Sequence, residues 1–220
     1  MTNTFLVVDE CFEEFLDEPE AYSIIPFLEK LSHVFVLKAF TKIYAMAGLR
    51  LGYALCSNED VLTKICQVRQ PWSVSGLAQR AGIAALKETE YVLKTRKLIH
   101  EQREKMEAAL TELGYIVYPS QANYIFFMEK TLEGATDSLY DRMLKQGVLI
   151  RSCSNYPGLD ASCYRICVKT EEENREFLHK LSQCTVTKRT DIKCTDTKHT
   201  DTVYTDANPT QAPHRPEKEE

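Results

Sequence analysis

Three charged side chains next to short apolar runs are the residues of this sequence best suited to chemistry. Asp9 directly follows the apolar run Phe5–Val8. Lys42 lies shortly after a second run, Val34–Leu37, and Arg50 comes eight residues later between two glycines. Short apolar runs of this kind predict buried strands. Because ligands gather at the carboxyl ends of strands in an open α/β sheet, we expect the carboxylate, the amine and the guanidinium to meet at one sheet edge.

These three groups, with a hydroxyl beside the lysine, match the needs of pyridoxal phosphate. A lysine amine such as that of Lys42 forms a Schiff base with an aldehyde cofactor. A carboxylate such as Asp9 keeps a pyridine nitrogen protonated, so that the ring accepts electrons. The forked guanidinium of Arg50 and the hydroxyl of Thr41 can hold a phosphate dianion. Each residue alone has a simpler interpretation, as a turn aspartate, a surface lysine or an ion-pair partner, so the prediction depends on their joint order and spacing.

The elements that must position these residues alternate between strand and helix over residues 1–183. The front part is predicted to contain strands at 5–8, 34–37 and 51–56 and helices at 20–31, 59–70 and 77–113, the last ended by Gly114. The back part is predicted to contain strands at 115–118, 123–128, 148–151 and 164–168 and helices at 136–146 and 171–182. This alternation favours an α/β fold, with a partial large domain over 1–90 built on a mostly parallel sheet, and a small α+β domain over 91–183.

Residues 184–220 differ in composition from the rest of the chain. They contain no Leu, Phe, Met, Trp or Gly, and a pentad beginning with Thr-Asp recurs four times over 190–209. A period of five matches neither a helix face nor a strand face, and the segment has little apolar surface to bury. We expect this segment to be a disordered tail.

The composition favours a soluble cytoplasmic protein that binds neither nucleic acid nor membrane. The net charge is -5 and the isoelectric point is near 5.7, whereas nucleic-acid surfaces are basic. Apolar runs such as Tyr124–Met128 are far shorter than the roughly 20 residues of a membrane helix, and the first residues lack the basic start of a signal peptide. The eight cysteines include no C-x-x-C pair and the five histidines are scattered, so we expect no metal site.

The stretch F-T-K-x-x-x-M-A-G-L-R-L-G-Y, preceded by V-V-D-E-C-F, resembles fold-type I pyridoxal-phosphate enzymes of aminotransferase classes I and II. Within them it is most similar to the histidinol-phosphate aminotransferase and threonine-phosphate decarboxylase types. The resemblance implies that Lys42 is the catalytic Schiff-base lysine and that Asp9 is the partner of the pyridine nitrogen. It also implies that Thr41 and Arg50 bind the cofactor phosphate, and that the substrate is a small phosphorylated amino acid. Enzymes of this family are homodimers, so a homodimer is expected.

Two later stretches resemble the substrate-binding part of the same family. The tripeptide A-N-Y, which contains Asn123, resembles a strand that contacts the substrate. Arg151 and Arg165 match the family's two arginines that hold anionic substrate groups, which implies that Arg165 binds the α-carboxylate and that Arg151 helps with the same anion or a phosphate. A salt bridge to the acidic run Glu171–Glu173 is the alternative for Arg151. The loop Pro71–Ser75 favours the decarboxylase branch slightly.

The sequence departs from the family pattern at two positions and in its extent. Ala39 stands where many relatives have a phosphate-binding serine, and Phe12 stands where the aminotransferases have a tyrosine that bonds the cofactor's ring oxygen. The motif order places Asp9 near the midpoint of the family, so we expect residues 5–183 to match its C-terminal half. Two other interpretations stay open: a non-catalytic fragment or half-subunit that needs a separate N-terminal half, and an unrelated α/β domain.

Overall fold

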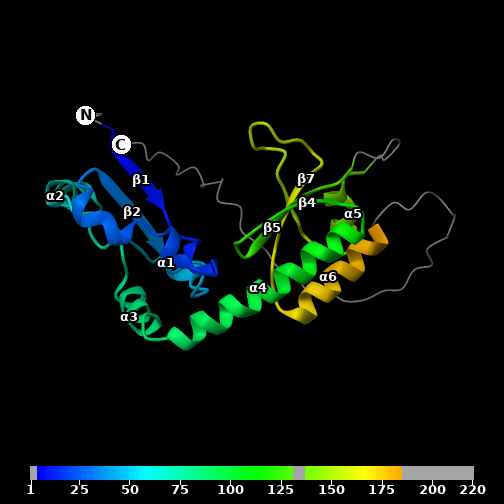
Figure 1. Cartoon of the computed structure of the whole chain (residues 1–220), viewed down its shortest axis with the longest axis horizontal. Helices are drawn as coiled ribbons and strands as arrows, with labels where there is room; N and C mark the ends of the chain where they lie inside the picture. Colours follow the sequence, from blue (N-terminus) through cyan, green and yellow to red (C-terminus); the bar gives the residue numbers. More distant parts are fainter. Residues whose placement is uncertain (1–3, 131–136, 185–220) are drawn as a thin grey trace, which may run out of the picture. The chain divides into compact units, whose positions relative to one another are not determined.

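A computed structural model describes residues 4–130 and 137–184 of the 220-residue chain. These residues belong to one compact unit, Met1–Val186. They form a mixed α/β structure with two separate sheets (Figure 1), which confirms the expected fold class. The predicted disordered tail lies outside the described residues, except for Cys184, which ends the last helix and is buried.

The first sheet has three strands in the order β1-β2-β3. Asp9 is the last residue of β1, and Lys42 follows the end of β2. The strands are β1 Leu6–Asp9, β2 Val34–Ala39 and β3 Gly52–Leu55. β1 runs parallel to β2, whereas β3 runs antiparallel to β2. The expectation of a mostly parallel sheet is therefore wrong for the second pair. The physical reason is the link between β2 and β3, which holds only the 3-10 turn η3, Ala47–Leu49, and no helix that could return the chain across the sheet.

Short helices accompany this sheet. They are η1 Glu13–Phe15, α1 Pro19–Tyr22, η2 Ile25–Lys30, α2 Glu59–Val68 and α3 Gly76–Ala85. The helix expected over 20–31 is interrupted at Ser23, whose backbone is extended, and the hydroxyl of Ser23 and the N–H of Ile24 both donate to the carboxylate of Glu10. Pro26, which has no N–H to donate, is the second residue of η2. The hydrogen bonds from Ser23 and Ile24 to the carboxylate of Glu10 therefore stand where a continuous helix would have its own backbone bonds.

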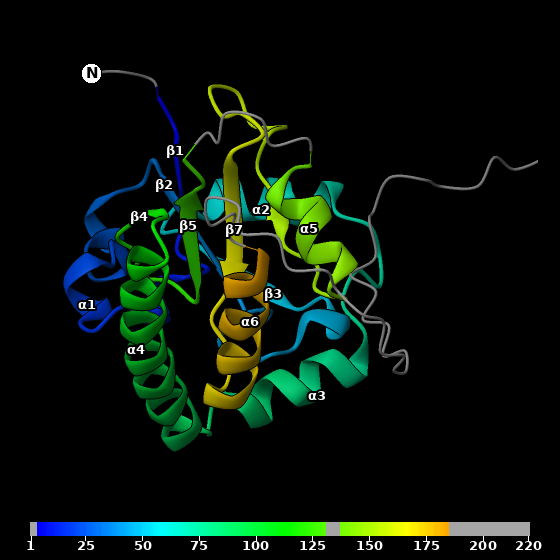
Figure 2. The same cartoon turned by 90° about the vertical axis from the view of Figure 1, so that its right-hand side faces the viewer.

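The second sheet is antiparallel throughout and has the order β4-β5-β7-β6. Its elements, with the helices that join them, are α4 Thr89–Glu112, β4 Ile116–Tyr118, β5 Tyr124–Met128, α5 Leu139–Lys145, β6 Arg151–Ser152, β7 Cys163–Cys167 and α6 Glu171–Cys184. The single helical stretch expected over 77–113 is thus two helices, α3 and α4, with a break at residues 86–88. α4 and α6 contact each other and run side by side (Figure 2). Gly114 ends α4 with a positive φ of 90°.

The main core lies between the second sheet and its helices. Its fully buried side chains include Leu110 of α4, Phe127 of β5, Met143 of α5, Tyr164 of β7 and Leu181 of α6. β1 is different, because Leu6 and Val7 keep 47% and 56% of their surface exposed. The expectation that this strand is buried on both faces is therefore wrong. Within the described residues β1 pairs with β2 alone, so no strand pairs with its other edge.

We expect Leu110→Ala to destabilise the protein strongly, because Leu110 is fully buried in the main core. The cost is about 2–5 kcal/mol, as for other buried leucines that leave a cavity. Leu93→Ala on the same helix, where the side chain is 60% exposed, is the matched control and should change stability by less than about 0.5 kcal/mol. Urea unfolding followed by circular dichroism measures both, and equal losses would contradict this placement of the core.

Candidate active site

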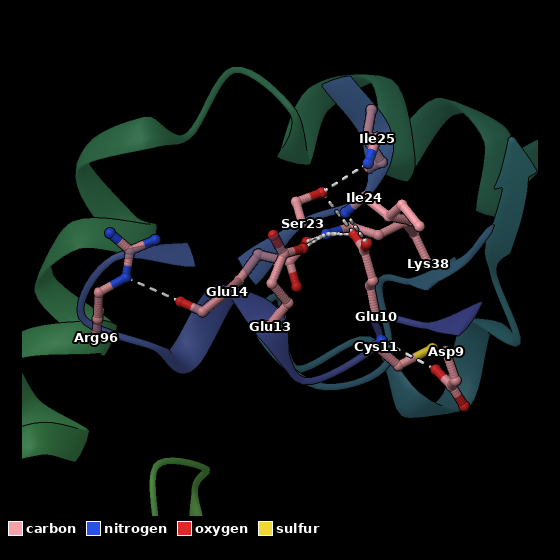
Figure 3. Close-up of polar contacts among 10 residues, drawn as sticks. All are labelled: Asp9, Glu10, Cys11, Glu13, Glu14, Ser23, Ile24, Ile25, Lys38 and Arg96. Atoms are coloured by element: carbon pink, nitrogen blue, oxygen red, sulfur yellow. Dashed lines mark hydrogen bonds and ion pairs between the residues drawn. The ribbon is translucent and has the colours of Figure 1, made fainter. Parts of the chain in front are cut away.

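The segment that follows β1 is folded around the ammonium group of Lys38. Lys38 lies on β2 and is only 8% exposed. Its Nζ contacts the carboxylate of Glu13, lies 2.9 Å from Glu14 Oε1 and lies 3.8 Å from Glu10 Oε2 (Figure 3). Three carboxylates from one short stretch thus share one buried cation, which holds residues 10–14 against β2.

The charges of this cluster support each other. Burial opposes the charge of Lys38, but the carboxylates of Glu13 and Glu14 outweigh it and raise the pKa of Lys38. Burial raises the pKa of Glu13, although its contact with Lys38 acts in the opposite direction. Because Lys38 stays protonated, its amine is no nucleophile, and its role is structural. Lys42, which is exposed and has no carboxylate partner in the described part of the chain, is the better placed amine.

Asp9 ends β1 and its carboxylate is exposed. Asp9 Oδ1 accepts a hydrogen bond of 3.0 Å from the backbone N–H of Cys11, so Asp9 also has the turn role that is its simpler interpretation. Hydrogen bonds from the thiol and the N–H of Cys11 lower the pKa of Asp9. The carboxylate is therefore ionised near neutral pH, as a partner for a protonated ring nitrogen must be. Burial, followed by the hydrogen bond to Asp9, raises the pKa of the Cys11 thiol to about 11.

Two aromatic rings link the loop that carries Lys42 to the second sheet. Lys42 Nζ lies over the ring of Phe12, 5.2 Å from its centroid. The ring of Phe12 meets the ring of Tyr124 edge to face, with centroids 5.5 Å apart. The guanidinium of Arg165 lies over the ring of Tyr124 at 4.9 Å. The structure thus connects Lys42 and Arg165, two predicted site residues from different sheets, through one aromatic pair.

Arg151 lies beside Arg165, because the two residues face each other in the pairing of β6 with β7. The guanidinium of Arg151 lies 5.9 Å from the ring centroid of Tyr156, and its Nη2 donates to Asn155 Oδ1 at 3.4 Å. Like charges opposite each other are unfavourable in a sheet unless an anion compensates them. Asn123 immediately precedes Tyr124 on the neighbouring strand. The two guanidinium groups are thus neighbours in register, whereas Asn123 lies beyond the end of the β5–β7 pairing, where its carbonyl accepts from the N–H of Val168.

The alternative interpretation of Arg151, a salt bridge to the acidic run Glu171–Glu173, is wrong for the described residues. Glu171 instead pairs with Lys105 at 3.3 Å, and Glu173 pairs with Lys169 at 2.9 Å. No ion pair with Arg151 or Arg165 is found in the ranges 4–130 and 137–184. Both guanidinium groups are therefore available to an external anion.

Thr41 and Arg50 belong to the loop between β2 and β3. Thr41 is half-buried and directly precedes Lys42, and Arg50 is exposed. Arg50 has a left-handed backbone, with φ 52° and ψ 45°, a conformation that residues other than glycine rarely adopt and that is often found at ligand-binding loops. Its Nη1 donates to the carbonyl of Ala47 at 3.4 Å. No contact in the described ranges joins Arg50 to Asp9 or Lys42, so the structure does not bring these three together directly.

Gly52 sets how closely β3 approaches β2. A Cβ at Gly52 would lie 2.9 Å from the carbonyl oxygen of Lys38, which is shorter than real side chains allow. The glycine therefore lets β3 approach the backbone of the residue that anchors the carboxylate cluster.

A cavity of about 480 Å³ lies next to Asp9. One wall comes from residues 8–22 and includes Asp9 and Phe12, and the other comes from residues 118–126 and includes Tyr124. Lys42, Arg50 and Arg165 do not line it. No group of three His, Cys, Asp or Glu side chains in the described residues could hold a metal ion, and none of the helices described is long and apolar enough to span a membrane.

Sequence reasoning missed Lys38, Glu13, Glu14 and Tyr124 as parts of this site. The alternation of V-F-V-L-K-A gives a signal for Lys38, since it places the lysine on the same face of the strand as Val34 and Val36, which are buried. No pattern shows that three earlier carboxylates surround it. Tyr124 was visible only as part of the A-N-Y tripeptide. Its role depends on a ring contact with Phe12, which lies more than a hundred residues away.

We expect Asp9→Asn to increase the reactivity of Cys11 towards iodoacetamide at about pH 8, because thiolate is the reactive form and the Asp9 carboxylate helps to hold the pKa of this thiol high. Alkylation rates at each cysteine are read from peptide masses over time. Cys66, which is exposed, is the internal control and should react at the same rate in both proteins. An unchanged rate at Cys11 would show that Asp9 does not control this thiol.

Comparison with known proteins gives this geometry a context. Residues 1–181 match the family described as aminotransferase class I and II. A threonine-phosphate decarboxylase of Salmonella typhimurium is 37% identical over 180 residues, which cover 81% of this chain and 48% of that protein. A histidinol-phosphate aminotransferase of Oleidesulfovibrio alaskensis is 35% identical over 183 residues, which cover 83% of this chain and 47% of that protein.

Solved structures agree with these matches. The histidinol-phosphate aminotransferase from Clostridium acetobutylicum superposes with a TM-score of 0.76 and 32% identity, covering 81% of this chain and 53% of that one. The L-threonine-O-3-phosphate decarboxylase from Porphyromonas gingivalis gives a TM-score of 0.68 and 26% identity, covering 80% and 54%. The chain spans about half the length of the curated relatives it matches. The chain belongs to the aminotransferase class I and II family.

Proposed function

We propose that this chain forms the C-terminal part of a pyridoxal-phosphate-dependent enzyme that acts on a small phosphorylated amino acid. The observation that carries this proposal is the connected series of Lys42, Phe12, Tyr124 and Arg165. It places an exposed amine on one side of an aromatic pair, and on the other a guanidinium that has no carboxylate partner among residues 4–130 and 137–184. Such an enzyme needs both groups, one for the cofactor and one for the substrate anion. The family membership supports the same conclusion.

The residues present fit the cofactor. Asp9 is ionised and exposed, and would pair with the protonated ring nitrogen. Lys42 would bond to the aldehyde, while Thr41 and Arg50 would hold the phosphate. When bound, pyridoxal phosphate supplies a ring that accepts the electrons of a bond broken at the substrate's α-carbon. The left-handed backbone of Arg50 is consistent with a loop shaped for this anion.

The residues of the second sheet fit the substrate. Arg165 would bind the α-carboxylate, Arg151 the same anion or the phosphate, and Asn123 would contact the substrate from the neighbouring strand. Guanidinium groups bind both anions with two parallel hydrogen bonds. Because Tyr124 supports the guanidinium of Arg165 from one face, the arginine is held in place before the substrate arrives. We place the enzyme in the cytoplasm, and expect it to work as a homodimer.

Decarboxylation is the reaction we favour over amino transfer. A transaminase needs an amine that moves the α-proton, and Lys42 is the amine available for this step. Phe12 has no hydroxyl group, so it cannot donate to a ring oxygen of the cofactor as the tyrosine of the aminotransferases does. Without that hydrogen bond, the transfer of the substrate's α-proton is less closely controlled. A decarboxylase depends more on the position of the carboxylate, which Arg165 would fix.

A half-subunit that needs a separate N-terminal half is the second candidate. One observation favours it: β1 pairs on one edge only within the described residues, and Leu6 and Val7 are exposed. A strand from another polypeptide could pair there and cover these side chains. In that arrangement Asp9 and Lys42 would keep the roles described above, and activity would require both polypeptides.

We expect pyridoxal phosphate, added to the folded chain and fixed with borohydride, to label Lys42 and not Lys38. Lys42 is exposed, whereas Lys38 is buried among carboxylates that keep it protonated. Mass spectrometry of the peptides locates the label. Lys42→Ala should lose it, and Lys64→Ala, a change on the outer surface of α2, should retain it. A label that persists in Lys42→Ala would place the reactive lysine elsewhere.

We expect chimeras of residues 4–184 with a relative's N-terminal half to release carbon dioxide from O-phosphothreonine, with little amino transfer to 2-oxoglutarate. One chimera takes that half from the Salmonella typhimurium decarboxylase, and a second takes it from the Clostridium acetobutylicum aminotransferase. If residues such as Phe12 and Arg165 decide the reaction, both chimeras decarboxylate, and Lys42→Ala abolishes the activity in each. Stoichiometric glutamate formation from histidinol phosphate by both would overturn the preference for decarboxylation.

A further inference from the structure

Two buried cysteines face each other across the hairpin that carries Arg151 and Arg165. The pairing of β6 with β7 places Arg151 opposite Arg165. The same register, continued by two residues, places Cys153 opposite Cys163, and the N–H of Cys153 donates to the carbonyl of Cys163 at 2.9 Å. Both cysteines are free, and they are 3% and 2% exposed. The two thiols are therefore cross-strand neighbours.

The backbone spacing of this pair suits a disulfide. Facing residues that share a hydrogen bond in an antiparallel pair have Cα atoms about 5.5 Å apart, and disulfides join Cα atoms about 4.4–6.8 Å apart. Cys153 Sγ donates to the carbonyl of Arg151 at 4.0 Å, and Cys163 Sγ donates to Asp160 Oδ1 at 3.7 Å. Thiols are weak donors, so these long contacts do not prevent a rotation of the side chains that brings the two sulfur atoms together.

The two thiols lie at the base of an exposed loop and not in the main core. Tyr164 and Phe127 are core residues, and successive side chains of a strand point to opposite faces. Cys163, which precedes Tyr164, therefore points away from that core. Residues 154–158, which follow Cys153, are exposed. A local opening of this loop exposes the thiols to solvent while the core stays closed.

The two arginines of the hairpin act on the thiol of Cys153. Burial raises the pKa of Cys153, whereas the guanidinium groups of Arg165 and Arg151 act in the opposite direction. When the loop opens, the effect of burial is lost and the positive charges favour the thiolate, which is the reactive form. The same charges attract an oxidant that carries carboxylates, such as oxidised glutathione.

We propose that Cys153 and Cys163 form a reversible disulfide when a low-molecular-weight disulfide oxidises them, and that this bond locks the hairpin that carries Arg151 and Arg165. The Cys153 thiolate attacks one sulfur of the small disulfide and releases the first small thiolate. The Cys163 thiolate then attacks the Cys153 sulfur and releases the second. The two cysteines lose two electrons and two protons, and the small disulfide gains them as two thiols. The bond forms without cofactor or substrate, so the proposal does not depend on the proposed function.

The disulfide changes how the two arginines are held. In the reduced protein, a backbone hydrogen bond from Cys153 holds this end of the hairpin, and the like charges of Arg151 and Arg165 oppose the pairing. A covalent bond two residues from each arginine suppresses the local openings in which the strands separate. The oxidised hairpin therefore keeps both guanidinium groups side by side when no anion compensates them.

Oxidised glutathione, added to the folded full-length chain, tests the proposal. After cleavage before Asp160, which separates the two cysteines, mass spectrometry should find their peptides joined, with the mass of two hydrogens lost, and dithiothreitol should reverse the bond. Cys153→Ser should lose it, whereas Cys66→Ser, a change at an exposed cysteine of α2, is the matched control and should retain it. Amide hydrogen exchange over 154–162 should be about tenfold slower in the oxidised protein, because the cross-link removes local openings.

Three results would overturn the proposal. Glutathione attached to Cys153 and Cys163, with no bond between them, would show that the two sulfur atoms cannot meet. Modification of Cys66 while both hairpin thiols stay unreacted would show that the loop does not expose them. Equal exchange over 154–162 in the oxidised and reduced proteins would show that the bond does not lock the hairpin. If Cys153→Ser does not fold, the joined peptides of the unmodified protein still identify the bond without any substitution.

Discussion

The ammonium group of Lys38, enclosed by the carboxylates of Glu10, Glu13 and Glu14, fixes the stretch of chain on which the rest of the site depends. Removal of one partner from a buried ion pair is costly, because the remaining charge stays in a medium that solvates it poorly. Phe12 lies within this stretch, so its ring position follows from the ion cluster. The ion cluster around Lys38 of the first sheet thereby fixes the position of the Phe12 ring, which contacts the ring of Tyr124 in the second sheet.

The contact between Phe12 and Tyr124 gives the two sheets a shared element. Each ring carries a cation over its face, Lys42 in one case and Arg165 in the other. Contacts of this type contribute about 0.5–2 kcal/mol each, which is modest, but their value here is positional. The amine and the guanidinium are oriented by rings whose own places are fixed by packing. A hydroxyl on the first ring is not needed for this arrangement, so phenylalanine preserves the geometry while removing a hydrogen-bond donor.

Local signals in the sequence predicted most of the elements, and non-local contacts account for what they missed. The helix expected over 59–70 is α2, which Asn58 caps, since its side chain accepts from the N–H of Val61, and Gly114 and Gly147 have the positive φ that ends a helix. The direction of β3 could not be read from its residues, because it depends on how the preceding loop turns. The expected roles of Lys42 and Arg50 came from their spacing and from the family resemblance, whereas the aromatic link between Lys42 and Arg165 required a contact between distant segments.

Gly52 carries a consequence for the variation that this fold can accept. Its missing Cβ would meet the carbonyl of Lys38, whereas a Cβ at Gly48 or Gly76 would have no atom within 4 Å. In a library that randomises all three glycines, Gly48 and Gly76 should tolerate alanine, and Gly52 should remain invariant among folded clones. A drift of sequence at Gly52 would separate β3 from β2 and loosen the backbone of Lys38. This position therefore limits how far the sequence of this chain can vary while it keeps the ion cluster around Lys38.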